Sequence, residues 1–201
     1  MKSLFLPLVL IFSAALSFGQ EVKTDNVSDF DTETNEIAPG RWAYGWFGRG
    51  KVTDPRMSLR LFTNSYPEEK VRGKNWTVDI RKAEAGWTIV QDGRTYTDGA
   101  EIVWIYQIPA KLAGKVAIRG SLERGGASRR MRVYKISDEF FSSEDRENLR
   151  PIYEGDGDAQ ALDFTLEALE NELLLFIVDD TAEKPKWTNP SLLHVMIGNA
   201  P

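Results

Sequence analysis

The chain has 201 residues, of which 42% are hydrophobic and 27% charged, a composition typical of globular proteins and unlike that of disordered or collagen-like chains. It contains no cysteine, so disulfides, thiolate metal sites and cysteine nucleophiles are excluded, and its one histidine, His194, excludes sites built from several histidines. The net charge of −5 argues against nucleic acid as a partner.

The first 19 residues have the pattern of a secretory signal peptide. Lys2 supplies the positive start, residues 4–16 are apolar apart from Ser13, and Ser17 and Gly19 are small residues before the cleavage position. The apolar run is shorter than the roughly 20 residues that a membrane-spanning helix needs. The sequence therefore predicts cleavage after Gly19, a secreted or periplasmic location and no membrane span after signal removal, with an uncleaved anchor as the alternative.

Residues 20–39 are polar and acidic and contain few apolar side chains, a pattern that predicts a flexible leader. We expect the ordered domain to cover residues 40–201. Within it, apolar residues recur at every second position, as in strands with one buried face, over residues 42–46, 59–61, 76–81, 115–121, 130–136 and 192–197. Residues 102–108 are apolar at nearly every position, which predicts a central strand covered on both faces and places Trp104 in the core.

Two segments are compatible with helices. The Ser142 to Asp145 spacing is that of a capping box, and it predicts a short helix that ends before Pro151. Over residues 165–174 the leucines have helical spacing, yet the apolar run that follows is typical of a buried strand and residues 170–172 can form a turn. We favour strand, turn, strand. About ten short strands separated by turns predict an all-β sandwich or barrel.

The order of several short motifs resembles that of galactose-binding-like jelly-roll domains, which are carbohydrate-binding-module-like domains of secreted bacterial proteins. The matching residues are Trp42, Tyr44, Gly45, Trp46, Trp76, Val103, Trp104, Pro109, Gly114, Val116, Ile118, Gly120, Phe176, Val178, Asp179, Pro190, Leu192 and Ile197. The resemblance implies a two-sheet β-sandwich, or jelly roll, of non-catalytic carbohydrate-binding type. Related modules often carry an acidic residue after the glycine-rich hairpin, but residues 129–133 of this chain contain none, so no role of that acid is transferred.

Aromatic side chains are the candidate ligand contacts, because sugar rings present apolar C–H faces that stack on them. Trp187 lies in a polar loop, where a tryptophan has little reason to occur unless it covers the core or contacts a ligand. Trp42, Tyr44 and Trp46 share one face of a strand and could bind ligand, although a buried face is the commoner position for such residues.

A structural calcium ion would need oxygen ligands at turns, and the candidates are Asp156, Asp158, Asp179 and Asp180. The Gly-Asp-Gly-Asp stretch at 155–158 fits a solvated acidic turn equally well. No other cofactor is expected.

Enzymatic activity would have to come from paired carboxylates, as in glycoside cleavage, and the available glutamates are Glu101, Glu139, Glu144, Glu154 and Glu167. None lies in an apolar strand, where burial would raise the pKa of a catalytic acid, so we expect no enzyme. The sequence thus favours a module that binds a polysaccharide or cell-envelope glycan. A structural or adhesive protein that binds another protein is the alternative, and a glycan-cleaving enzyme is the third hypothesis.

Overall fold

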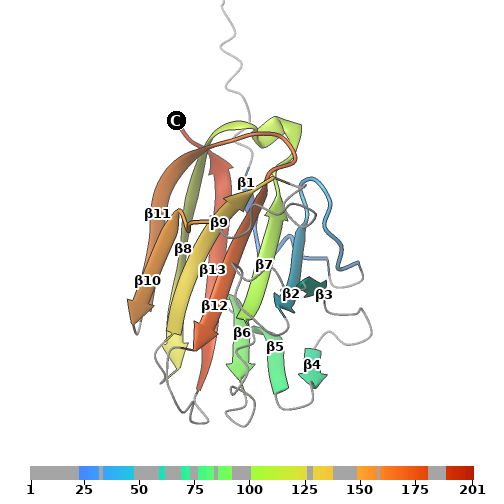
Figure 1. Ribbon diagram of the computed structural model, residues 1–201, viewed down its shortest axis with the longest axis vertical. Coiled ribbons are helices and arrows are strands. Elements are labelled where there is room, and N and C mark those ends of the chain that lie inside the picture. The colour runs from blue at the N-terminus through green and yellow to red at the C-terminus, as the bar shows by residue number, and fades with distance from the viewer. Residues whose placement is uncertain are drawn as a thin grey trace, which may run out of the picture.

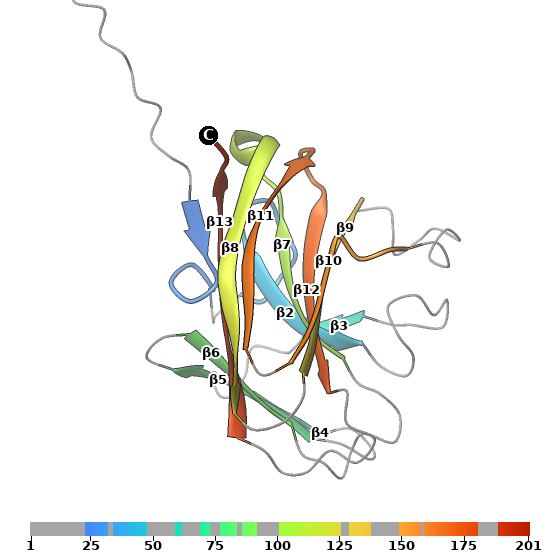
Figure 2. The same cartoon turned by 90° about the vertical axis from the view of Figure 1, so that its left-hand side faces the viewer.

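The computed structural model describes residues 23–31, 34–47, 59–61, 69–72, 77–83, 86–91, 101–125, 129–137, 149–157, 159–180 and 189–201. These residues form two antiparallel sheets that face each other (Figure 1, Figure 2). Most connections between consecutive strands in the second half of the chain cross from one sheet to the other, as in a jelly roll. The predicted all-β sandwich is therefore confirmed, while the short helix predicted before Pro151 falls on residues 142–148, outside the described residues.

The seven-stranded sheet contains the longest strands. Its order is β11 (Ala159–Ala168), β8 (Gly114–Gly125), β13 (Asn189–Asn199), β6 (Gly86–Gln91), β5 (Thr77–Ala83) and β4 (Glu69–Arg72), and the short strand β1 (Lys23–Asp25) also pairs with β13. Because neighbouring β8 and β13 have 12 and 11 residues, at about 3.4 Å per residue they form a face some 35–40 Å long.

The six-stranded sheet has the order β10 (Tyr153–Gly157), β9 (Arg129–Ile136), β12 (Leu173–Asp180), β7 (Glu101–Gln107), β2 (Trp42–Phe47) and β3 (Leu59–Leu61). One 3₁₀ turn, η2 (Ala110–Leu112), connects β7 to β8. In the described part of the chain, no helix has the length and apolar character needed to cross a membrane.

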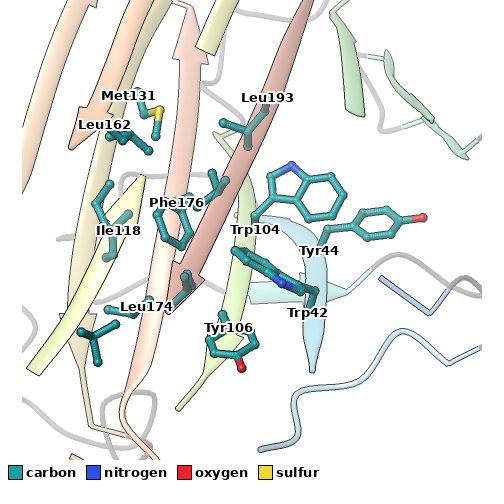
Figure 3. Close-up of a cluster of buried hydrophobic side chains, with 14 of the residues drawn as sticks. Trp42, Tyr44, Trp104, Tyr106, Ile118, Met131, Leu162, Leu174, Phe176 and Leu193 are labelled. Atoms are coloured by element: carbon teal, nitrogen blue, oxygen red, sulfur yellow. The ribbon is translucent and has the colours of Figure 1, made fainter. Parts of the chain in front are cut away.

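The main core lies between the two sheets and is rich in aromatic side chains (Figure 3). Trp104 is fully buried, and its ring lies 5.0 Å from that of Tyr44. Val103 and Ile105, the neighbours of Trp104 on β7, are also fully buried, but they belong to a second apolar cluster on the other face of the sheet. The prediction that β7 is a central strand buried on both faces is therefore confirmed. Continuous apolar sequence is typical of strands that have other parts of the protein packed on both faces.

The segment over 165–174 forms two strands joined by a turn, as favoured from the sequence. Asn171 adopts a positive φ of 67°, which asparagine tolerates better than most residues, and the Leu169 N–H donates to Oε2 of Glu172 at 2.7 Å. The turn carries the chain from β11 in one sheet to β12 in the other. The helix-like spacing of the leucines does not correspond to one buried face: Leu166 packs against the main core, Leu173 is buried in the second cluster, and Leu169 is 70% exposed in the turn.

The N-terminal segment differs from the flexible leader expected over residues 20–39. Strand β1 pairs with residues 196–198 of β13, and Phe30 is buried against the rings of Tyr44 and Trp104 at centroid distances of 4.6 and 5.6 Å. The physical reason is that one aromatic side chain in a polar segment can occupy a gap in the core, and a low average hydrophobicity conceals it.

Two asparagines fasten this segment to the two sheets. The Val195 N–H donates to Oδ1 of Asn26 at 2.7 Å, while the Asn26 side chain and backbone donate to the Leu193 and Val195 carbonyls at 3.3 and 3.1 Å. Asn35 binds β2 in a similar way. Its side-chain amide donates to the Tyr44 carbonyl at 2.8 Å, and its Oδ1 accepts from the Tyr44 N–H at 2.9 Å. A carboxamide has the same donor and acceptor as a peptide group, so each asparagine replaces one residue of a neighbouring strand.

Candidate functional site

Of the four predicted aromatic contacts, the structure describes the side chains of Trp42 and Tyr44, and both lie in the core. Trp42 and Tyr44 are only 1% and 4% exposed, and their rings pack between the sheets (Figure 3). They therefore cannot stack on a sugar in this structure, because strand β2 turns this face towards the core. Trp46 also lies in β2, but its side chain is outside what the structure describes, and Trp187 falls in the segment 181–188, which is likewise outside it.

Three of the acidic residues considered for calcium are placed by the structure, and they lie on two strands. Asp156 lies on β10, where its carboxylate is 3.5 Å from the Arg130 guanidinium, and Asp179 is opposite the same arginine on β12. Asp158 and the side chains of Asp179 and Asp180 are outside the described residues, within which no group of three or more acidic or histidine side chains is arranged to hold a metal ion. The cation beside Asp156 in this structure is Arg130.

The glutamates considered for catalysis do not converge where the structure describes them. Glu154 is half-exposed and lies 3.8 Å from Arg130, and Glu167 is exposed on β11 in the opposite sheet. Glu139, Glu144 and the side chain of Glu101 fall outside the described residues. The described carboxylates thus offer no pair flanking a common cleft, the arrangement that glycoside cleavage requires.

His194 forms an ion pair with the N-terminal strand. Its Nε2 lies 2.9 Å from Oδ2 of Asp25, which is 24% exposed and whose Oδ1 accepts hydrogen bonds from the Val27 and Ser28 N–H groups. Partial burial acts to raise the pKa of Asp25, but the hydrogen bonds from His194, Ser28 and Val27 and the charge of His194 outweigh it, so the pKa lies below its ordinary value of 3.8. The pair holds β1 to β13.

This lowered pKa predicts a pH dependence of stability. A carboxyl group whose pKa is lower in the folded state stabilises the fold fully above its unfolded pKa, and the contribution is lost as the pH falls through the folded pKa. We expect the stability difference between the natural protein and Asp25→Asn to shrink as the pH falls below 3.8. Urea titrations of both proteins across this range measure the difference, and a gap that persists unchanged at pH 2 would contradict the assignment.

A shallow hollow lies on the outer face of the seven-stranded sheet, where β1, β13 and β8 run side by side. Its volume is about 90 Å³, and it is lined by Lys23, Ala117, Arg119, Met196, Ile197, Gly198, Asn199 and Pro201. The strand register explains it: Gly198 of β13 is paired with Ala117 of β8 on one side and with Lys23 of β1 on the other. Since directly opposed residues of an antiparallel pair point to the same face, two neighbouring positions with almost no side chain leave a depression.

The next row of paired residues forms one wall of this hollow. Met196 of β13 is opposite Arg119 of β8, and Arg119 in turn is opposite Asp163 of β11. Met196 supplies apolar surface, while Lys23 and Arg119, both exposed, supply hydrogen-bond donors. A typical ligand pocket encloses about 300–1,000 Å³, so the hollow can receive only a substituent of a larger ligand that extends over the sheet.

Sequence reasoning missed this hollow and its residues. Ala117 and Arg119 lie on a strand that was predicted correctly, and their outward positions follow from its alternation. What the alternation does not reveal is which residues of β13 and β1 lie beside them. Strand pairing brings Lys23 next to Gly198, across almost the whole length of the chain.

No protein-family model and no curated protein matches the sequence. Among solved structures, the chain is similar to the enzymatically active domain of tailspike protein 4 of bacteriophage CBA120, with 7% identity, a TM-score of 0.41 and coverage of 87% of this chain but only 21% of that chain. It is similar to a family 35 carbohydrate-binding module from Clostridium thermocellum, with 12% identity, a TM-score of 0.34 and coverage of 67% and 90% of the two chains. It is also similar to the CBM22-1 xylan-binding domain of Paenibacillus barcinonensis Xyn10C, with 14% identity, a TM-score of 0.36 and coverage of 68% and 89%.

At these identities and TM-scores the likeness concerns the fold, and it carries no argument about a ligand. Most of the similar solved structures are carbohydrate-binding modules, from families that include 4, 22, 27 and 35. In architecture, this chain resembles the β-sandwiches of that group.

Proposed function

We propose that this domain binds a polysaccharide outside the cytoplasm and does not cleave it. The observation that carries the proposal is the hollow between β1, β13 and β8, which opens onto a long exposed sheet face. Sugar recognition combines apolar surface for C–H groups with a few fixed polar partners. Met196 and Ala117 offer the first, and Lys23, Arg119 and Asn199 offer the second.

The outer face beyond the hollow also suits an extended polymer. Strand alternation places short side chains there, among them Ser121 on β8 and Ala161 and Thr165 on β11, and the longer side chains between them are charged and exposed.

Trp187 is proposed as a further sugar contact. It belongs to the polar segment that leads into β13, the central strand of the hollow. A stacked aromatic ring contributes about 0.5–1.5 kcal/mol beyond area burial, equivalent to a roughly two- to tenfold change in affinity. Export of the chain, with Gln20 as the first residue of the mature protein, is part of the same proposal and rests on the signal-like pattern of the first 19 residues.

A glycan array probed with residues 20–201, followed by calorimetry on the polysaccharide that binds, tests this function. We expect a dissociation constant in the micromolar to millimolar range, because a shallow face leaves much of the ligand solvated, and no release of reducing ends. Trp187→Ala should weaken binding about two- to tenfold, whereas Trp187→Phe, which keeps a stacking ring, should retain most of it.

Failure of every glycan to bind would overturn the proposal and favour the adhesive alternative. That alternative needs an exposed aromatic surface, but in the described residues the large exposed hydrophobic side chains are Ile152 and Leu169, on different connections. Release of reducing ends by the purified protein would instead favour a glycan-cleaving enzyme.

A further inference from the structure

We propose that the polysaccharide is acidic, and that the hollow receives one of its carboxylate or sulfate groups between Lys23 and Arg119. This inference rests on the proposed function, because it names the class of sugar bound at the same site. It starts from the charges around the hollow: two of the side chains that line it are cationic, and none of them is acidic. In a chain with a net charge of −5, such a local excess of positive charge is unexpected.

Strand register explains how the cations are separated from nearby acids. On β8, Lys115 and Arg119 are opposite Glu167 and Asp163 of β11, so the acids lie on the far side of the cations from the hollow. Lys115 lies at the rim, but its Nζ donates to a terminal oxygen of Pro201 at 3.3 Å, so its charge is engaged there and is not counted with those of Lys23 and Arg119. On the β11 side the acids thus lie beyond the cations, while on the β1 side Asp25 is opposite Met196.

Two carboxylates could compete for these cations, and neither holds them strongly. Asp163 lies 3.6 Å from Arg119, but the two side chains are 82% and 64% exposed, and a solvent-exposed pair of this kind contributes little. Asp25 is close to Lys23 in sequence, yet its carboxylate is already occupied by His194 and by two backbone N–H groups. Lys23 and Arg119 are thus available to an incoming anion.

The size of the hollow also fits an anionic substituent. A volume of about 90 Å³ accommodates a carboxylate or sulfate with a few waters, while the sugar ring rests outside against Met196. An arginine fork pairs with two oxygens of such a group, and a lysine ammonium adds a second charge-assisted hydrogen bond. A neutral hydroxyl would form weaker hydrogen bonds with these two cations than a carboxylate or sulfate does.

The N-terminal segment holds one half of this anion site in place. Lys23 belongs to a strand of only three residues, which would be too short to dock by itself. The Asn26 hydrogen bonds to β13 and the His194 ion pair with Asp25 fix that strand, so Lys23 reaches the hollow with its backbone already ordered. Preorganisation of this kind lowers the entropic cost of binding.

Matched polysaccharides test the inference. Polygalacturonate and fully methyl-esterified pectin share one backbone but differ in charge, and dextran sulfate with dextran makes the same comparison for sulfate. Calorimetry with the full mature chain should show binding of the acidic member of at least one pair, with at least about tenfold weaker binding of its neutral counterpart. Arg119→Gln and Lys23→Gln should each weaken binding about two- to fivefold, and Arg150→Gln, an exposed arginine outside the hollow, should leave it unchanged.

The possible outcomes separate this inference from the proposed function. Equal binding of charged and neutral members, unaffected by the Arg119 and Lys23 changes, overturns the acidic ligand and leaves polysaccharide binding intact. Binding of no polysaccharide at all overturns both. Equal binding of polyglutamate, or equal weakening by Arg150→Gln, would reveal unspecific charge attraction or an acidic protein partner, and either result overturns the inference.

Discussion

Replacing Trp104 by alanine is expected to lower the free energy of unfolding by about 3–5 kcal/mol, the usual cost of removing a large buried aromatic side chain. The indole is fully buried, and its ring packs at 5.0 Å from Tyr44 and edge-on at 5.6 Å from Phe30. Its removal leaves a cavity that rings from two other segments cannot fill, because they are held by their own backbone pairing. A urea or guanidinium titration measures the loss.

The control for this change is Leu169→Ala. Leu169 is 70% exposed in the turn region between β11 and β12, so shortening it should change the stability by no more than about 0.5 kcal/mol. Trp104→Phe should give an intermediate loss, since a smaller ring fills part of the space. A Trp104→Ala protein as stable as Leu169→Ala would show that the aromatic core is not packed as described.

The second large effect is expected for Asn26→Ala, which should cost about 1–3 kcal/mol. Asn26 is fully buried, and its side chain supplies the acceptor for the Val195 N–H and a donor to the Leu193 carbonyl. Alanine supplies neither, so the Val195 N–H would be left without an acceptor in a place that water does not reach. Amide hydrogen exchange at Val195 should accelerate together with the loss of stability.

Ser28→Ala is the matched control within the same segment. Ser28 is exposed, and its side chain makes one long hydrogen bond of 3.3 Å to Asp29, so its removal should change little. If Asn26→Ala leaves both the stability and the exchange at Val195 unchanged, the N-terminal segment does not fasten to β13 in the way described.

Much of the architecture could be predicted from local patterns. Alternation along residues 115–121 and 130–136 predicted strands that the structure contains as β8 and β9, and the continuous apolar run at 102–108 predicted that β7 is covered on both faces. These predictions succeed because side-chain alternation is a property of the strand itself, so the partner strand need not be known. Trp104 was assigned to the core for the same reason.

The aromatic trio shows where local patterns are insufficient. Period-two spacing places Trp42 and Tyr44 on one face of a strand but does not say whether that face meets solvent or the other sheet. Likewise, the polarity of residues 20–39 predicted a flexible leader, because an average over 20 residues hides the three that matter most for docking: Asn26, Phe30 and Asn35.

By itself, the sequence determined that this protein is an all-β domain with an aromatic core, since periodicity and burial preference are encoded residue by residue. Only the tertiary structure decided where a ligand can bind. The hollow exists because Gly198 lies beside Ala117 and Lys23, residues 81 and 175 positions away along the chain, and such neighbours are chosen by strand register. Register depends on the packing of the whole sandwich, because a shift of one residue would reverse the faces of every strand involved.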